Sequence, residues 1–331
     1  MKTNLYIIHK GIDISYKDQT IYVQDKDLSY SLPIQSVNSV QIFANNVLNT
    51  DFIRACMKYH IPMYFISVKG KYLGKINNIQ SHAIENRLTQ YAVYFDEDRK
   101  LSLAKDIIAG KIRNSLQMLY RFRRLIGYNL SEEIEQIVRV KNSIDSVKDI
   151  QTLMGYEGIV ARHYFQGIGR TLPEAFQFST RTRHPPLDPA NSMLSFGYTL
   201  LANNIMTAIE VNGMDPYIGF IHSTIRNNPA LVLDMMEEFR AIMVDSIVIS
   251  LIESRKVKYE DFQFKEGKNC TPVFIGNNVK KELIGAYEKR LKVKVDYDGR
   301  TVPFIRVFYY QVEKMKEAIK SNTDYKPFSF R

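Results

Sequence analysis

The sequence predicts an α+β protein, with a small β-rich, β-sandwich-like N-terminal domain over residues 1–80 and a larger all-α C-terminal domain over residues 81–331. Three observations support this prediction. Short runs of β-branched and aromatic residues, separated by polar turns, fill the first part of the chain. From about His82 the apolar residues recur with the period of a helix. A chain of 331 residues with 45% apolar content is long enough for two domains with separate cores.

The N-terminal domain is expected to consist of short strands interrupted by a single helix at residues 49–59. The expected strands are residues 5–8, 12–16, 20–24, 30–33, 37–43, 63–68 and 72–75. So many short strands in a small domain leave little interior volume and exposed strand edges, which a second copy would cover. We therefore expect a homodimer built through this domain.

The C-terminal domain is expected to begin after a junction at residues 79–81 with one long helix over residues 86–125. Further helices are expected at residues 131–141, 146–165, 172–178, 190–212, 229–254, 277–290 and 303–320. Apolar spacing predicts these helices, and Asn228 and Pro229 additionally mark the start of the one at residues 229–254.

Composition favours a polyanionic partner. Lys and Arg exceed Asp and Glu by 45 to 35, which gives a net charge of +10 and a pI near 9.3. The two cysteines, Cys56 and Cys270, have no Cys-x-x-Cys spacing, so we expect a cytoplasmic protein without disulfides. No apolar run is long enough for a signal peptide or a membrane span, so no membrane attachment is expected.

Glu157 is the first candidate for a functional carboxylate. It lies in a stretch with helical apolar spacing, and Leu153 and Val160 lie about one turn away on either side. A carboxylate on an apolar face must be protonated, paired with a base or bound to a cation. Gly155 and Gly158 flank it, and residues without a Cβ allow close approach of a backbone or a ligand.

A histidine and a group of carboxylates follow later in the chain. His222 ends an apolar run, and Pro229 then marks an expected helix start. On that helix Asp234, Glu237 and Glu238 lie three and four residues apart on neighbouring ridges. Like charges packed in this way repel unless a cation lies among them. Together with the earlier glutamate, these residues predict a divalent-metal site.

Each residue also has a structural interpretation. Glu157 could be paired with a base, and the candidates are Arg162, Arg181 and Arg183. His222 could be a hydrogen-bonded core histidine, and acidic residues early in a helix ordinarily complement its dipole. Taken together, one imidazole and two carboxylates leave coordination positions open for a cation that also binds phosphate oxygens. The imidazole favours Mn²⁺, and Mg²⁺ should also work.

Two groups of basic residues are predicted to contact DNA. Lys111 and Arg113 lie on the long first helix, where the alternative is a solvated face. Arg181, Arg183 and His184 precede two prolines in a loop, an arrangement that suits contacts with phosphate.

Several short motifs follow one another in a particular order along nearly the whole chain. They are Leu-Asn-Thr at 48–50, Gly-Lys-Ile-Arg-Asn at 110–114, Gly-Tyr-Glu-Gly at 155–158, His-Pro-Pro-Leu-Asp-Pro-Ala-Asn at 184–191, Leu-Ser-Phe-Gly-Tyr at 194–198, Ile-Gly-Phe-Ile-His at 218–222, Leu-Val-Leu-Asp-Met-Met-Glu-Glu-Phe-Arg at 231–240 and Tyr-Lys-Pro-Phe at 325–328. In this order and spacing they resemble CRISPR-associated protein one, the spacer-acquisition endonuclease and integrase family of CRISPR-Cas systems.

The resemblance implies specific roles. The family's metal ligands fall on Glu157, His222 and Glu237, and an additional acidic residue close to the metal falls on Asp234. Ala241 departs from the family, in which proline is common after Phe-Arg. The resemblance also implies that double-stranded DNA is the substrate, and that prespacer 3′-hydroxyl ends are joined to the CRISPR repeat by transesterification. The family works as homodimers bridged by the small CRISPR-associated protein two.

Three other functions remain open from the residues alone. A zinc hydrolase acting on a small substrate could use the same three ligands. A homologous integrase encoded by a transposon would be chemically indistinguishable. A non-catalytic DNA-binding scaffold would use the basic surface alone.

Overall fold

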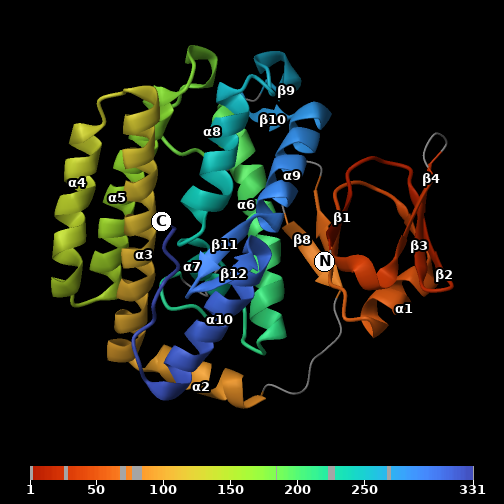
Figure 1. Cartoon of the computed structure of the whole chain (residues 1–331), viewed down its shortest axis with the longest axis horizontal. Helices are drawn as coiled ribbons and strands as arrows, with labels where there is room; N and C mark the ends of the chain where they lie inside the picture. Colours follow the sequence, from red (N-terminus) through yellow and green to blue (C-terminus); the bar gives the residue numbers. More distant parts are fainter. Residues whose placement is uncertain are drawn as a thin grey trace. The chain divides into compact units, whose positions relative to one another are not determined.

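The computed structural model describes residues 3–25, 29–67, 72–76, 84–183, 185–222, 228–266 and 270–330. The chain divides into two compact units, Met1–Ser81 and His82–Arg331 (Figure 1). The junction expected at residues 79–81 lies outside the described residues, as does His184.

The N-terminal unit contains two four-stranded sheets, with strand orders β1-β5-β7-β8 and β4-β3-β2-β6. The first sheet is mixed, because β1 and β7 pair parallel to β5 whereas β8 pairs antiparallel to β7. The second is antiparallel except for its β2–β6 pair. The strands are β1 Thr3–Ile7, β2 Asp13–Lys17, β3 Thr20–Gln24, β4 Ser29–Pro33, β5 Val37–Ile42, β6 Val47–Leu48, β7 Met63–Ile66 and β8 Tyr72–Ile76.

Both sheets and the helix α1 (Thr50–Lys58) contribute to one core in this unit. Ile14 and Ile21 come from one sheet, Val40 and Met63 from the other, and Phe52 from α1, and all five are fully buried. The strands expected from the sequence are present within a few residues of their predicted ends. The two-residue strand β6 was not predicted, because so short a segment carries no periodicity.

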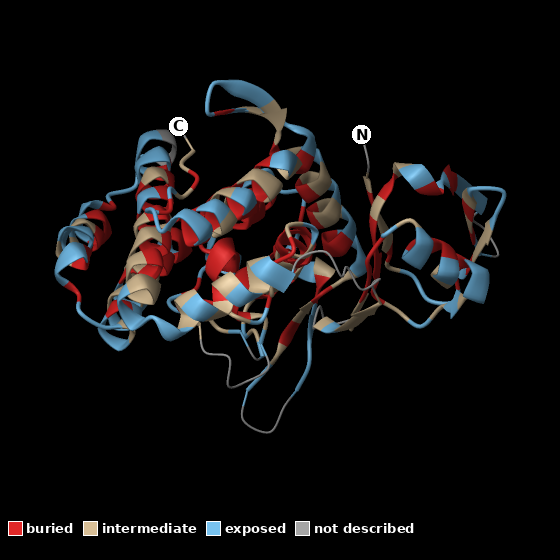
Figure 2. Cartoon of the chain, turned by 90° about the horizontal axis from the view of Figure 1, so that it is seen from below, coloured by how far each residue is buried: buried red, intermediate tan, exposed pale blue. Residues whose placement is uncertain are grey.

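The C-terminal unit is built mainly of helices around the buried α6. The helices are α2 Ile84–Phe95, α3 Glu97–Ile126, α4 Ser131–Ser143, α5 Ile150–Thr171, α6 Pro189–Val211, α7 Ala230–Met236, α8 Ser246–Glu253, α9 Asn277–Lys292 and α10 Phe304–Ser321. α3, α4 and α5 pack side by side, and α6 contacts α7, α8, α9 and α10 (Figure 1). Buried residues gather on the inward sides of these helices (Figure 2). In the part of the chain that the structure describes, no helix is long and apolar enough to cross a membrane.

The long helix expected at residues 86–125 is two helices. The helix is interrupted at Asp96. The side chain of Asp96 accepts a hydrogen bond from Arg99 N at 3.0 Å and so caps the start of α3. Apolar residues continue at helical spacing across this position, although Gln90 is the buried residue of α2. Periodicity alone therefore could not reveal the interruption.

The prediction of an all-α domain was wrong in detail, because two small antiparallel hairpins interrupt the helices. They are β9 Phe262–Phe264 with β10 Val273–Ile275, and β11 Lys294–Tyr297 with β12 Arg300–Pro303. The second hairpin turns at Asp298 and Gly299, both with positive φ, which is a strong hairpin signal that the sequence does contain.

The helix expected at residues 172–178 was also wrong in extent. It is a single 3₁₀ turn at Glu174–Phe176, and it follows Pro173, which is extended. A few residues with helical spacing cannot be distinguished from an isolated turn.

Candidate functional site

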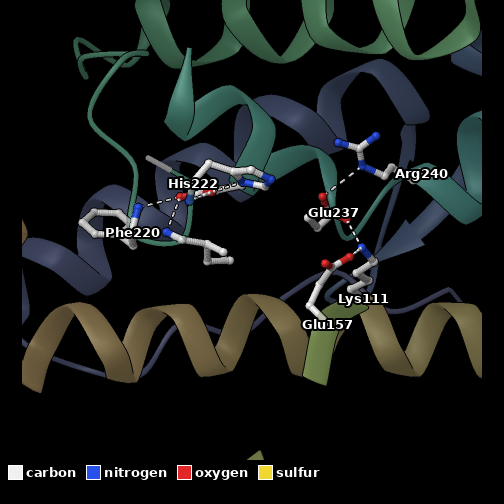
Figure 3. A network of polar contacts seen from close by, with 8 residues as sticks. Lys111, Glu157, Phe220, His222, Glu237 and Arg240 are labelled. Carbon is white, nitrogen blue, oxygen red and sulfur yellow. Dashed lines mark hydrogen bonds and ion pairs between the residues drawn. The ribbon is translucent and has the colours of Figure 1, made fainter. Parts of the chain in front are cut away.

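Two carboxylates from different helices meet at one lysine. Lys111 on α3 forms an ion pair with Glu157 on α5 and lies 2.6 Å, Nζ to Oε2, from Glu237, which follows α7 (Figure 3). Arg240 approaches Glu237 from the other side, with Nε 3.1 Å from Oε1. The side chains of Glu237, Lys111 and Glu157 are 5%, 12% and 27% exposed, so this cluster is largely enclosed yet reaches solvent at Glu157.

The charges in this cluster stabilise one another. Burial alone would raise the pKa of Glu237, but Arg240, Lys111 and His222 outweigh burial and lower this pKa to about 2. Burial opposes the charge of Lys111 as well, and Glu237 and Glu157 overcome it, so the pKa of Lys111 lies above its usual value. Glu237 and Lys111 are therefore both ionised at neutral pH.

One oxygen of Glu237 faces Lys111 alone. Its Oε2 is buried 2.6 Å from Lys111 Nζ, and no other described residue donates to it. A buried carboxylate oxygen in this state retains a lone pair for a cation.

Asp234 organises the loop that carries His222. Its Oδ2 accepts from Phe220 N at 2.5 Å and Ile221 N at 3.0 Å, and its Oδ1 accepts from His222 N at 3.1 Å. The loop can close over the carboxylate because residue 219 is glycine. A Cβ on Gly219 would lie 2.6 Å from Asp234 Oδ2.

The same carboxylate fixes the imidazole. His222 Nδ1 lies 2.7 Å from Asp234 Oδ1, so Nδ1 carries the proton and Nε2 is left as the nitrogen for a ligand. Burial opposes the charged imidazolium, but Asp234 and Glu237 outweigh it, and the pKa of His222 lies above its usual value. The imidazole extends toward Glu237 (Figure 3). Because the oxygens of Asp234 are used within the protein, this residue positions His222 instead of binding a cation directly.

The segment that carries Glu237 is not the continuous helix expected over residues 229–254. α7 ends at Met236, residues 237–239 form a turn, and Ala241–Asp245 form a π-helical turn before α8. π-helical turns are rare in proteins as a whole, and those that occur are often found at functional sites. Apolar spacing did not reveal this one because every residue of the π-helical turn is buried.

The π-helical turn places Asp245 beneath two tyrosines. Tyr164 and Tyr198 donate to Asp245 at 2.8 and 2.6 Å, and the Arg240 guanidinium lies 4.6 Å from the centre of the Tyr198 ring. Burial raises the pKa of Asp245 to about 6, although both tyrosines act against this shift. Arg240 is thus enclosed between Glu237 and an aromatic ring. Sequence reasoning missed the roles of Asp245 and Arg240.

The C-terminal segment, residues 325–330, braces this part of the site. The buried Glu238 carboxylate accepts from Tyr325 OH, the Phe328 amide and Gln311 Nε2. Asn114 Nδ2 donates to the carbonyl oxygens of Glu238 and Phe328 at 2.8 Å each. Glu238, which follows Glu237, and Asn114, about one helical turn after Lys111 on α3, are therefore both hydrogen-bonded to the C-terminal segment.

A close contact explains one glycine in this arrangement. A Cβ on Gly110 would lie 2.3 Å from Pro327 Cβ, so α3 and the C-terminal segment can meet only without a side chain there. The ring of Phe328 stacks on Phe239 with centroids 5.8 Å apart. The motifs at residues 110–114 and 325–328, far apart in sequence, therefore meet in space.

The predicted DNA-contact residues differ in their positions. Arg181 is half-buried and donates to Asn191 Oδ1 at 2.7 Å and Ser195 Oγ at 3.0 Å, so part of its guanidinium is engaged within the protein, and its contact with DNA stays a prediction. Lys111 is engaged with carboxylates and is not a surface cation. Arg113 and Arg183 are exposed.

A small cleft adjoins the charged cluster. Its lining includes Lys111, Ser115, Arg183, Tyr198 and Arg240. Glu237 and Asp245 line it as well, so three basic side chains and two carboxylates meet at this cleft, with the exposed Arg183 as the basic group that no described carboxylate of the cluster contacts.

The three expected metal ligands are not drawn together as a ready-made ligand group. Among the described residues, no cluster of three or more His, Cys, Asp or Glu side chains is arranged to hold a metal ion. Glu157 and Glu237 instead share Lys111, so the pairing of Glu157 with a base, considered from the sequence, is present, but with a lysine in place of the arginines considered.

The sequence is similar to a known family over nearly its full length. The model of the family described as CRISPR associated protein Cas1 matches residues 5–289. A CRISPR-associated endonuclease Cas1 of Thermus thermophilus is 31% identical, and the alignment covers 99% of this chain and 97% of that protein. A CRISPR-associated endonuclease Cas1 of Moorella thermoacetica is 30% identical, with 99% and 98% covered.

Solved structures share the fold. A casposase bound to integration product has a TM-score of 0.87 at 23% identity, covering 100% of this chain and 95% of that one. A Cas1 protein from Thermotoga maritima has a TM-score of 0.84 at 21% identity, with both chains covered completely. A chain of a Cas6-RT-Cas1–Cas2 complex has a TM-score of 0.84 at 22% identity, with 99% of this chain and 36% of that one covered. The resemblance indicated by the motifs is confirmed, and the chain belongs to the CRISPR-associated Cas1 family.

Proposed function

We propose that this protein is a divalent-metal-dependent DNA endonuclease and integrase of CRISPR adaptation. The observation that carries the proposal is the convergence of Glu157 and Glu237 on one cation position, beside a histidine whose ring Asp234 holds. The endonuclease names of the relatives at about 30% identity support the same function.

The donor set fits a hard or borderline divalent cation. Glu157 and Glu237 supply carboxylate oxygens, and among the described residues only Lys111 faces the buried Oε2 of Glu237. His222 supplies Nε2, because Nδ1 is engaged by Asp234. Two oxygens and one nitrogen suit Mn²⁺ or Mg²⁺ and leave positions for phosphate oxygens. Bound there, such a cation would supply Lewis-acid polarisation of the scissile phosphate and acidify the attacking oxygen.

The protein's own residues account for positioning. Asp234 keeps the His222 imidazole in one tautomer and one orientation, which preserves the geometry of the site. Arg240 balances the charge of Glu237 and is itself held against Tyr198. The exposed Arg183 at the cleft is the better candidate for contact with a DNA backbone, in place of the half-buried Arg181.

We propose that the preferred nucleophile is a DNA 3′-hydroxyl. Holding a DNA end beside the target phosphate replaces a bimolecular encounter with an effectively unimolecular one. The net charge of +10 favours binding of the two duplexes that this reaction requires. Strand transfer of prespacer ends into a CRISPR repeat should therefore exceed simple nicking.

The proposed assembly is a homodimer that joins a small CRISPR-associated partner, Cas2. The support for Cas2 as a partner is a Cas6-RT-Cas1–Cas2 complex, one chain of which shares this fold. We propose that the N-terminal unit forms the dimer contact. Light scattering at micromolar concentration should give the mass of a dimer, and a monomer would count against this part of the proposal.

The experiment uses a supercoiled plasmid that bears a CRISPR repeat, Mn²⁺ and the Cas2 partner. A prespacer with a 3′-hydroxyl should be joined covalently, and the same prespacer ending in a dideoxy nucleotide should not. If the blocked DNA gives as much joined product, or if neither DNA is joined while nicking stays brisk, the integrase function is wrong and a plain nuclease remains.

A transposon-type integrase is the second candidate, because a casposase structure shares this fold. The relatives at about 30% identity, which are named CRISPR-associated, favour the CRISPR role. Joining into a repeat-bearing plasmid, compared with a plasmid that carries transposon target sequence, distinguishes the two.

A further inference from the structure

Lys111 combines features that an ordinary structural lysine does not need. It contacts both proposed carboxylate ligands, Glu157 and Glu237, and its side chain is 12% exposed. It also lines the adjoining cleft together with Arg183. With Arg240 on Glu237, the four side chains carry two positive and two negative charges and are balanced.

Building on the proposed function, we propose that Lys111 is an internal counter-cation that a divalent metal ion displaces, and that the displaced ammonium then binds a DNA phosphate in the adjoining cleft. Metal and DNA would therefore bind cooperatively.

Competition for the carboxylates is the first step. Lys111 Nζ contacts the same two carboxylates that a divalent ion would use, and both cannot contact them at ion-pair distance together. Lysine is suited to leave because its ammonium is carried on a flexible stem and needs no fixed fork geometry. Arg240 is not, because its guanidinium lies 4.6 Å from the centre of the Tyr198 ring while its Nε contacts Glu237.

Charge balance provides the second step. Adding a divalent cation to a balanced cluster leaves two positive charges in a largely buried site, which is unfavourable without an anion. Arg183, Ser115 and Glu237 line the same cleft, so an ammonium that leaves the two carboxylates would remain in this cleft and would face a phosphate bound at its exposed Arg183. A DNA phosphate would restore the balance through charge-assisted hydrogen bonds.

Coupling of this kind must be reciprocal. If metal binding releases a cation for DNA, then bound DNA must tighten metal binding by the same factor. Lys111 would carry this coupling, and a chain without its ammonium should bind metal tightly whether DNA is present or not.

The test measures Mn²⁺ binding directly, from the loss of the free-ion electron paramagnetic resonance signal, with and without a duplex DNA. The variants are Lys111→Met, Lys111→Arg and, as a matched loss of charge, Lys141→Met at an exposed position of α4. Without DNA, Lys111→Met should bind Mn²⁺ about tenfold or more tightly than wild type. DNA should tighten binding in wild type and in Lys141→Met but hardly in Lys111→Met. Lys111→Arg should bind more weakly than Lys111→Met.

Stability provides a second measurement that remains informative if Lys111→Met folds poorly. In chelator this variant should melt below wild type, because the buried Glu237 and the half-buried Glu157 lose their shared cation, and Mn²⁺ should restore most of the difference. Equal Mn²⁺ affinities in wild type and Lys111→Met, or equal effects of DNA on both, would overturn the inference while leaving the proposed function intact. A wild-type protein that binds no Mn²⁺ would instead overturn the proposed function.

Discussion

Glu237 and Glu238 are adjacent and both buried, at 5% and 1% exposure, but their carboxylates face different surroundings. Glu237 faces the cations Lys111 and Arg240, and its pKa falls to about 2. Glu238 faces neutral donors such as Tyr325, and burial raises its pKa to about 7. Burial alone therefore does not decide what a carboxylate can do. On the proposed function, a carboxylate that faces a displaceable lysine takes a metal ion, whereas one held by neutral hydrogen-bond donors secures the fold.

The largest expected effect is on the rate of DNA joining, and it distinguishes Glu237 from Glu238 when each is replaced by glutamine. Glu237→Gln should lower Mn²⁺-dependent DNA joining on the order of 10³-fold, because a charged ligand is lost from the Lewis-acid site. Glu238→Gln should stay close to the wild-type rate, because an amide can still accept from the Phe328 amide and donate to Tyr325. Initial rates at saturating Mn²⁺ measure both, and similar losses in the two variants would remove the distinction.

The second effect concerns pH. Folded Glu238 holds its proton more tightly than the unfolded chain does, since its pKa is raised from 4.5 to about 7. Raising the pH through this window therefore favours unfolding, by at most about 3 kcal/mol above pH 7. Glu238→Gln lacks this loss, so denaturant unfolding at pH 4.5 and pH 8 should show wild type losing stability relative to the variant. The exposed Glu253→Gln is the control and should follow wild type. A constant difference between wild type and Glu238→Gln would contradict the assignment.

The smallest expected effect is on the free energy of unfolding, and it tests the close contact between α3 and the C-terminal segment. Gly110→Ala places a methyl group against Pro327 and should destabilise the protein by about 1–3 kcal/mol. Gly285→Ala on α9, where no described atom lies within 4 Å of the added Cβ, should instead stabilise by roughly 0.5–1 kcal/mol. Denaturant unfolding compares them. If both variants gain stability, the C-terminal segment does not depend on close contact with α3.

Sequence patterns predicted the presence of helices and strands better than the positions at which the helices are interrupted. Apolar periodicity predicted most helices, but the break at Asp96 depends on one side chain within a continuing apolar pattern. The turn at residues 237–239 and the π-helical turn after it are buried, and their carboxylates Glu237, Glu238 and Asp245 lie inside the protein instead of marking a solvent-facing side, so periodicity did not reveal where the helix ends. The hairpin at Asp298 and Gly299 does carry a sequence signal, the Asp-Gly dipeptide, although it lies between two helices and was not predicted.

The site was predictable where local context was unusual. Glu157, His222 and Glu237 stood out because each combined a polar group with apolar neighbours and a recognisable motif. Lys111 was predicted to contact DNA, and its place in this cluster was not predicted, because its partner Glu157 lies 46 residues away and only the fold brings the two together. The use of Asp234 as an acceptor for consecutive amides likewise depends on Gly219, whose role is visible only in the closed loop.

The most direct test of the central claim is Mn²⁺ binding measured by equilibrium dialysis, without any reaction. Wild type and Glu238→Gln should each bind a single Mn²⁺ ion with similar affinity. Glu157→Ala, His222→Ala and Glu237→Ala should each bind it at least about tenfold more weakly, because each removes one of three ligands. Retention of wild-type affinity by any two of these three variants would contradict the assignment of this cluster as the metal site.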